Sequence, residues 1–281
     1  MISILAGLGT ATLFAIGMLT AAQASRVVGP FRVVAWSAMV ASILLAPFLL
    51  FGERPTDIST GQTWLLVLSG LCNILGFIFV YTALGVGKVG VVAPIVATQG
   101  AVTAVLAALT GSVVEGIVTF WLIVVILGVV IAARSQDPEP IPREQPVRAV
   151  LLATCGSVVF GISLLAIGTL SGELPIQWVL MPARLTGILL ITLPLALQGK
   201  LRVPVKLIPI LVLTGICDVG GITLYSVGAE FNVPVTAVVA SQMAPLAAIF
   251  AYIVFRERLG RGQIAGIFVI IVGVSALSLL Q

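Results

Sequence analysis

The sequence predicts an all-α integral membrane protein with ten transmembrane helices, arranged as two inverted five-helix repeats. Three observations support this fold class. The 281-residue chain is 60% hydrophobic and only 9% charged, whereas soluble domains contain about 25% charged residues. Apolar runs recur at the length of about 20 residues that an α-helix needs to cross a bilayer. Short motifs of the first half return in the second half, which indicates an internal duplication.

Each expected helix is an apolar run between short polar loops. Stretches such as residues 65–84 do not alternate between polar and apolar positions as barrel strands would, so helices are expected. The first run lacks the basic segment of a signal peptide and exceeds the length of its apolar core, so we expect it to be the first helix. The expected spans are residues 2–22, 27–51, 62–84, 89–111, 116–134, 148–170, 175–197, 205–228, 232–254 and 260–280.

The duplication is visible in several short motifs at nearly constant offset. The first of them aligns Asn73 with Asp218, and the second aligns Arg32 with Arg184. The matching pairs are SGLCNILG (69–76) with TGICDVGG (214–221), GPFRVV (29–34) with MPARLT (181–186), LFAIG (13–17) with VFGIS (159–163), and VATQG (96–100) with VASQM (239–243). A chain that repeats in this way is expected to fold as two copies of one helical unit.

The domain organisation follows from the repeat. We expect a first repeat over residues 1–134 and a second over 148–281, joined by a proline-rich, charged cytoplasmic linker at 135–147. Because each copy holds an odd number of helices, the second must enter the membrane in the opposite direction.

Lysine and arginine positions test this inversion independently. Only Arg54 falls on the far side of a ten-helix arrangement. By the positive-inside rule the basic side is cytoplasmic, which predicts a cell (inner) membrane protein with both termini extracytoplasmic. The residues expected on the basic side are Arg26, Lys88, Arg134, Arg143, Arg148, Lys200, Arg202, Lys206, Arg256, Arg258 and Arg261.

Composition also argues against several function classes. The chain has no histidine, and its cysteines, Cys72, Cys155 and Cys217, show no paired spacing, so neither a metal site nor a cofactor is expected. Motifs for a phosphate-binding loop or a nucleophilic serine are absent, so we expect neither an ATP-driven pump nor an enzyme. The net charge of +4 is explained by the loop arginines and lysines and does not indicate a nucleic-acid partner.

Inverted repeats are a recurrent architecture of secondary transporters, whose substrate sites lie near the bilayer midplane. The C-terminal half also resembles the EamA domain. Pro245 lies in the ninth expected helix, Glu257 follows that helix in FRERL, and the tenth expected helix is rich in small residues, with glycines seven positions apart at Gly266 and Gly273. Two such repeats are typical of the ten-helix members of the drug/metabolite transporter superfamily. The resemblance implies export of amino acids, metabolites or drugs. The first copy departs from the pattern, with Val102 at the position of the proline.

Charged side chains at bilayer depth are costly unless they are paired or face water. Asp218, Arg184 and Arg32 are expected there, and they predict a central cavity in which an arginine receives an anionic group and Asp218 an ammonium group or a proton. An amino-acid zwitterion suits such a set. The alternative is an internal Asp218–Arg salt bridge that fixes helix packing, and the two readings are compatible if the bridge opens for the substrate.

Matched polar positions and aromatic residues complete the predicted substrate site. Asn73 is the uncharged counterpart of Asp218, with an interhelical hydrogen bond as the alternative role. The others are Thr98, Gln99, Ser241 and Gln242 as pocket walls and Trp36, Tyr81, Phe160 and Tyr225 as stacking partners.

The predicted function is export of small metabolites, foremost amino acids, by alternating access. Lipophilic drugs and phosphorylated sugars or nucleotides are the alternative substrates, and a polytopic membrane enzyme is the distant alternative. Uniport and proton antiport are both compatible with the sequence. The expected partners are the small-molecule substrate and the lipid bilayer, with the protein a monomer; Gly262 and Gly266 could also support a dimer.

Overall fold

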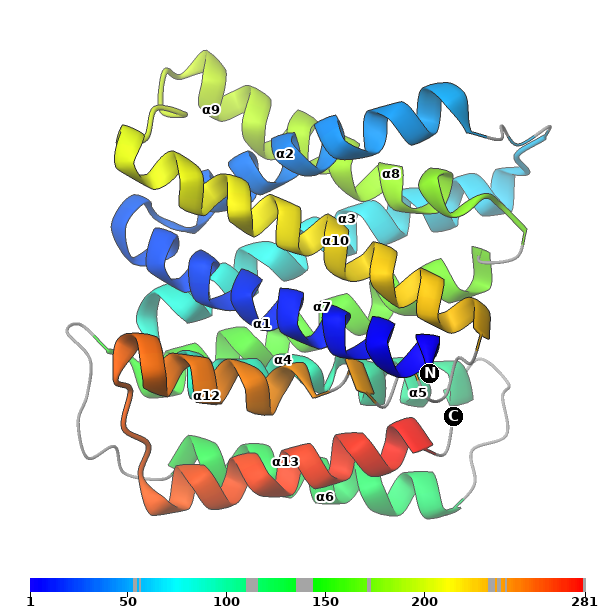
Figure 1. Ribbon diagram of the computed structural model, residues 1–281. Helices are drawn as coiled ribbons and strands as arrows, with labels where there is room; N and C mark the ends of the chain where they lie inside the picture. Colours follow the sequence, from blue (N-terminus) through cyan, green and yellow to red (C-terminus); the bar gives the residue numbers. More distant parts are fainter. Residues whose placement is uncertain are drawn as a thin grey trace.

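The computed structural model of the chain consists of helices that lie side by side in stacked layers (Figure 1). It describes residues 1–52, 55, 57–109, 116–134, 144–170, 173–231, 236, 239–240 and 242–279. The regular structure in these ranges is helical, as the sequence predicts. The helices are α1 Ile2–Val28, α2 Pro30–Phe51, α3 Thr60–Val86, α4 Val89–Ala97, α5 Gln99–Leu109, α6 Gly116–Arg134, α7 Pro146–Leu170, α8 Ile176–Gly187, the π-helix η1 Ile188–Thr192, α9 Leu193–Leu197, the 3₁₀-helix η2 Val205–Leu207, α10 Ile208–Phe231, α12 Met243–Phe255 and α13 Arg261–Leu279.

Many of these helices have the length and composition of membrane spans. Among the described residues, six spans are long and apolar enough to cross a bilayer: Ile2–Val28, Pro30–Phe51, Thr60–Val86, Pro146–Leu170, Ile176–Leu197 and Val205–Gly228. Shorter apolar helices cover Val89–Thr103, Ile123–Ala132, Met243–Phe255 and Arg261–Leu277. An all-helical chain with several membrane-length spans is therefore confirmed, and the count of ten crossings stays a prediction.

Two expected helices contain local irregularities. The span expected over 89–111 is divided at Thr98, whose N–H and hydroxyl both bond the carbonyl of Ile95. The span expected over 175–197 contains η1, which precedes Pro194. Since proline has no N–H to donate, the preceding carbonyls need other partners, and a π-turn is one way to reach them.

The main helix pairs follow the repeat. Helix α3 packs on α7, and α1 packs on α10; the two pairs are equivalent, because the repeat relates α1 to α7 and α3 to α10. A Cβ at Gly76 of α3 would collide with the ring of Phe160, and one at Gly221 of α10 would collide with the ring of Phe14. This correspondence supports the predicted duplication, while the boundaries 1–134, 135–147 and 148–281 stay a prediction.

Helices α6 and α13 form a third pair. A Cβ at Gly266 would overlap the backbone of Gly128 and Ala132. Gly266 therefore serves close helix packing within the chain, as small residues commonly do in membrane helices.

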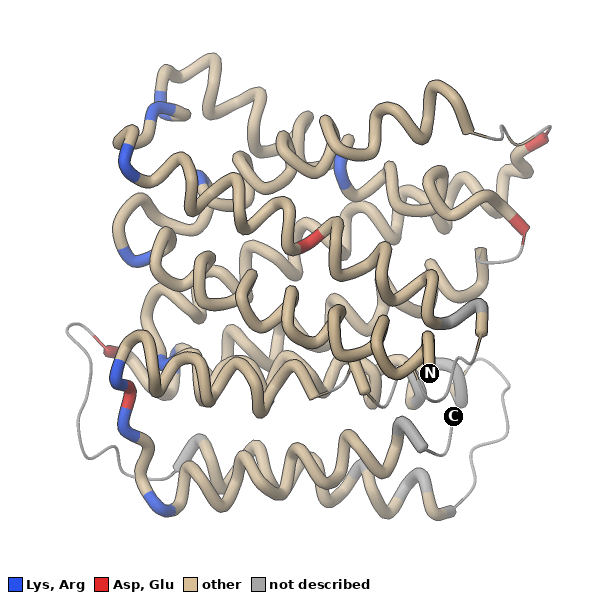
Figure 2. The backbone as a smooth tube through the Cα atoms, in the orientation of Figure 1, with Lys and Arg blue, Asp and Glu red and all other residues tan. Residues whose placement is uncertain are grey.

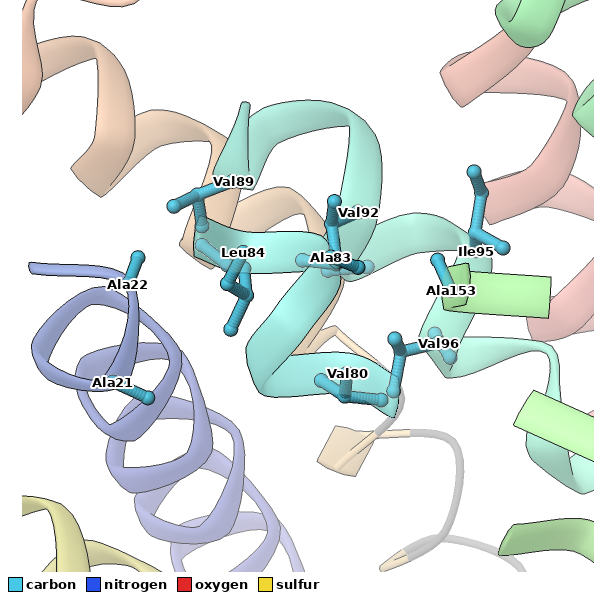
Figure 3. Close-up of a cluster of buried hydrophobic side chains, with 14 of the residues drawn as sticks. Ala21, Ala22, Val80, Ala83, Leu84, Val89, Val92, Ile95, Val96 and Ala153 are labelled. Carbon is cyan, nitrogen blue, oxygen red and sulfur yellow. The ribbon is translucent and has the colours of Figure 1, made fainter. Parts of the chain in front are cut away.

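The core is built of small and branched apolar side chains around α4. Every residue from Val89 to Ala97 is buried. Small neighbours let the surrounding helices approach this short segment closely. Figure 3 shows Ala21 and Ala22 of α1, Val80, Ala83 and Leu84 of α3, Val89, Val92, Ile95 and Val96 of α4, and Ala153 of α7.

Candidate functional site

The charged residues expected at bilayer depth include a pair that the fold encloses. Figure 2 shows Lys/Arg and Asp/Glu colours midway along the helices as well as at their ends. Arg184 of α8 and Asp218 of α10 form an ion pair, with 2.7 Å between Nη1 and Oδ2 and side chains only 8% and 15% exposed. Both helices pack against α2, and α8 also packs against α3. Helices from both halves of the chain therefore surround the pair.

Neither member of this pair has its hydrogen-bonding capacity filled. Among the described residues, Arg184 Nε and Asp218 Oδ2 are buried without a hydrogen-bond partner. The contact between the two side chains is short but lacks hydrogen-bond geometry, so its attraction is coulombic. A buried polar atom left unpaired costs about 1–3 kcal/mol. The arrangement thus leaves a donor and an acceptor available to a third group.

A small cavity adjoins Arg184 between α2, α3 and α8. Its volume is about 10 Å³, close to the about 10–15 Å³ that a single water needs. Asn73 also lines this cavity, and its Oδ1 is a further buried atom without a partner in the described part of the chain. Both copies of the repeated motif thus place a polar side chain beside Arg184. The lining residues are Val34, Ser37, Ala38, Asn73, Ile74, Phe77, Ala183 and Arg184.

An aromatic wall continues from the cavity along α3. Phe77 lies 5.3 Å from Tyr81 between ring centroids and 5.1 Å from Phe160, the latter in an edge-to-face arrangement. The buried Tyr81 lies against the side chain of Ser37 and within electrostatic range of Arg184 and Asp218. The structure therefore brings two predicted aromatic residues, Tyr81 and Phe160, to the site.

Sequence reasoning missed Phe77 and Ser37. A signal for Phe77 was present, because Asn73, Phe77 and Tyr81 follow the i, i+4, i+8 spacing of one helix face. No comparable signal marks Ser37, whose contribution depends on how α2 packs against α3 and α8.

The structure does not place Arg32 at the helix position that corresponds to Arg184. Helix α2 begins at Pro30, whereas α8 begins at Ile176, so the aligned prolines, Pro30 and Pro182, occupy different turns of their helices. Arg32 lies in the first turn of α2 and donates from Nε to the Lys200 carbonyl at 2.8 Å and from Nη1 to the Val28 carbonyl at 3.4 Å.

Trp36 forms a hydrogen bond at the same end of the molecule as Arg32. Its indole N–H donates to the Leu201 carbonyl at 3.2 Å. Together with Arg32 it ties α2 to the turn after α9, and no described contact joins either side chain to Asp218.

The remaining predicted residues are more scattered. Thr98 bonds the hydroxyl of Ser157 on α7 at 2.7 Å, and Gln99 begins α5 beside it. Gln242 donates to the hydroxyl of Ser275 at 3.1 Å, and Ser241 lies outside the described residues. Tyr225 is half-buried on α10. None of the described contacts links these side chains to Arg184.

A second charged cluster, which sequence reasoning did not assemble, closes the end of the molecule where most lysines and arginines lie (Figure 2). We call Arg26, Lys88, Gly90, Glu257 and Arg258 the basic-end cluster. Arg26 Nη2 lies 2.9 Å from Glu257 Oε1, and the Gly90 N–H donates to Glu257 Oε2 at 3.2 Å. The buried Lys88 ammonium donates to the Arg258 carbonyl at 2.6 Å. The end of α1, the α3–α4 loop and the α12–α13 loop are joined in this way.

Arg26 has several acceptors besides the carboxylate. It also donates from Nε to the Leu84 carbonyl at 3.3 Å and from Nη2 to the Gly87 carbonyl at 2.9 Å. Its guanidinium lies 5.1 Å from the centre of the Phe255 ring, within cation–π range. In the sequence, the residues of the basic-end cluster are only charges in separate loops. The fold is needed to show that these loops meet.

No group of three or more His, Cys, Asp or Glu residues that could hold a metal ion occurs among the residues that the structure covers.

Comparisons with known proteins add the following findings. A family model described as "EamA-like transporter family" matches residues 1–134 and 147–279. No curated protein matches the chain. Among solved structures 24 chains match; one, titled "Crystal structure of protein", has a TM-score of 0.63 at 20% identity and covers 97% of this chain and 95% of its own. At that identity the likeness concerns the fold alone.

Proposed function

The chain belongs to the EamA-like transporter family, and from this premise we propose that it exports small metabolites, amino acids foremost, by alternating access through the Arg184–Asp218 site. The family and the apolar helices make it a multi-pass membrane protein and a transporter of small molecules. Members of the family are transporters and not enzymes. Substrate, direction and mechanism are the parts that we propose.

The observation that carries the substrate proposal is the set of incompletely bonded polar atoms at the cavity and beside it. Among the described residues, Arg184 Nε is an N–H without an acceptor, Asn73 Oδ1 is an acceptor without a donor, and Asp218 Oδ2 contacts Arg184 Nη1 at 2.7 Å without hydrogen-bond geometry. An amino acid supplies the complement, because its carboxylate accepts from a guanidinium and its ammonium group donates to carboxylate and amide oxygens. A zwitterion also leaves the charge balance of the Arg184–Asp218 pair unchanged.

The cavity of about 10 Å³ is too small for any metabolite, so transport requires the helices around it to separate. The basic-end cluster joins segments of both halves, Arg26 and Lys88 from the first and Glu257 and Arg258 from the second. We propose that this end is cytoplasmic and that opening toward the cytoplasm breaks these contacts. Ten crossings, extracytoplasmic termini and a monomer in the inner membrane complete the proposal.

One observation favours a second substrate class. The wall of Phe77, Tyr81 and Phe160 is suited to stacking on lipophilic drugs. Phosphorylated sugars or nucleotides receive less support, since they would need two free arginines, and Arg32 is bonded to backbone carbonyls at the end of α2.

Counterflow in proteoliposomes tests the proposal. Vesicles containing the purified protein are loaded with one unlabelled compound and given the labelled compound outside, across a panel of amino acids, cationic drugs and organic anions. We expect amino-acid counterflow by the wild type and its loss in Asp218→Asn and Arg184→Gln, whereas Arg202→Gln, at an exposed residue outside the site, behaves as wild type. Counterflow of none of the panel, or of drugs only, would overturn the amino-acid assignment.

A further inference from the structure

The surface at the end of α12 contains a hollow that takes no part in the transport proposal. Its volume is about 240 Å³, and it is lined by Tyr252, Ile253, Arg256 and Arg258. Two guanidinium groups and a phenol thus border one open space, and no lining residue is acidic. The hollow is far larger than the about 10–15 Å³ that one water needs.

The three charged side chains of the α12–α13 turn point alternately outward and inward. Arg256 and Arg258 are exposed, whereas Glu257 between them is 4% exposed and has both carboxylate oxygens engaged by Arg26 and Gly90. The carboxylate nearest in sequence therefore faces inward, where it is neutralised by Arg26. Arg256 and Arg258 thus present their exposed side chains on the outer face of this turn.

Arg256 adopts a conformation that is unusual for its residue type. Its φ of 54° and ψ of 32° are left-handed, and Arg256 is the only non-glycine residue with a positive φ in the part of the chain that the structure describes. Glycine or asparagine normally occupies this position after a helix. Strained backbone that persists at one place is a pointer to a functional requirement there.

An apolar surface leads directly into the hollow. On α12, Ile249, Tyr252 and Ile253 are 53%, 63% and 65% exposed, so this face of the helix meets the hydrocarbon of the membrane. Arginines at the end of such a helix lie at the level of the headgroups. The hollow therefore lies where an apolar helix face ends and the arginines of the α12–α13 turn begin. Figure 2 shows that most lysines and arginines lie at this end of the molecule.

From these observations we propose that the hollow binds the phosphate headgroup of an anionic phospholipid. The phosphate lies between the guanidinium groups of Arg256 and Arg258, which suit phosphate oxygens geometrically. The Tyr252 hydroxyl is a further donor, and an acyl chain follows Ile253 and Ile249 along α12. A lipid bound there contacts the outer face of the same turn whose inner face holds Glu257 in the basic-end cluster.

Native mass spectrometry of the full-length protein tests this site. The protein is titrated with phosphatidylglycerol, with phosphatidylcholine and with inorganic phosphate. We expect retained phosphatidylglycerol on the wild type, and a loss of affinity of about fivefold for each arginine removed, so about 25-fold in Arg256→Gln/Arg258→Gln. The matched control Arg202→Gln removes an exposed arginine outside the hollow and should stay within twofold of wild type.

A second double variant guards against misfolding. Arg256→Gly/Arg258→Gln removes the same charges, and glycine accepts the left-handed conformation without strain, so this variant should keep the wild-type melting temperature and still lose the lipid. Equal losses in Arg202→Gln would show unspecific attraction and overturn the proposal, as would retention of lipid by both double variants. Equal retention of phosphatidylcholine would overturn the anionic assignment, and saturation by inorganic phosphate would show a free-anion site.

Discussion

Two ion pairs in the described part of the chain, Arg26–Glu257 and Arg184–Asp218, differ in how completely they are hydrogen-bonded. At the basic end, Glu257 uses both oxygens, and Arg26 also bonds two backbone carbonyls. At the centre, Arg184 and Asp218 touch at a similar distance, yet Nε of the one and Oδ2 of the other have no hydrogen-bond partner among the described residues. In the first pair, which we call the saturated pair, both carboxylate oxygens are engaged, whereas in the central pair Arg184 Nε has no acceptor among the described residues. An arginine paired with a carboxylate thus joins helices in one place and leaves hydrogen-bonding atoms for a ligand in the other.

The largest expected effect on stability comes from breaking the saturated pair. Glu257→Ala leaves the Arg26 guanidinium without its carboxylate and the Gly90 N–H without its acceptor. We expect the free energy of unfolding to fall by about 3 kcal/mol, since removing one partner of a buried pair is strongly destabilising. Denaturant titration of the purified protein in detergent measures this. The control Glu173→Ala removes an exposed carboxylate bonded to Gln62 and should change stability by less than about 0.5 kcal/mol.

Breaking the Arg184–Asp218 pair should reduce transport strongly and stability only slightly. Asp218→Asn keeps the side-chain volume and removes the charge, and we expect substrate uptake to fall at least tenfold, since about 1.4 kcal/mol of lost binding has that effect. The loss of stability should be smaller than that of Glu257→Ala. If Asp218 also carries the proton, the pH dependence of uptake disappears in the same variant. Thr223→Val serves as control, at an exposed residue of the same helix whose hydroxyl donates to the Val219 carbonyl. A similar drop in its uptake would assign the effect to α10 in general.

Asn73 tests whether the neutral copy of the motif also serves the site. Asn73→Ala removes an acceptor that has no partner in the described structure, so little stability should be lost. The substrate KM should rise about fivefold with an unchanged maximal rate, as expected for one lost hydrogen bond of about 1 kcal/mol. Initial uptake rates at several substrate concentrations separate the two parameters, and a large fall in melting temperature with normal KM would show a structural role.

The aromatic wall should give the smallest effect. Phe77→Leu removes ring contacts with Tyr81 and Phe160 and should cost about 1 kcal/mol of stability. We expect preference among competing substrates to shift two- to threefold toward bulkier side chains. Competition uptake with small and large amino acids measures the shift, and an unchanged order would place the wall outside the substrate path.

Much of the fold could be predicted because it depends on local apolar length. Most expected spans overlap helices among the described residues, and the motif containing Asn73 and Asp218 aligns Gly76 with Gly221, which contact Phe160 and Phe14 in the same way. The alignment of Arg32 with Arg184 failed, because Arg32 lies in the first turn of α2 whereas Arg184 lies near the end of α8. Similar short sequences can thus occupy different positions along their helices.

What could not be predicted depends on how helices meet. Ser37 approaches Arg184 through the packing of α2, and Arg26 meets Glu257 across 231 positions of sequence. The break at Thr98 arises from hydrogen bonds to Ile95 and Ser157, which no periodicity of apolar residues indicates.

The most direct test of the central claim couples a change in the protein to a change in the substrate. Equilibrium binding of an amino acid and of its analogue without the amino group is measured on wild type and on Asp218→Asn. If Asp218 receives the ammonium group, wild type prefers the amino acid by about tenfold, and the variant binds the two compounds equally. An undiminished preference in Asp218→Asn would contradict the account, because the charge of Asp218 would then play no part in recognising the substrate.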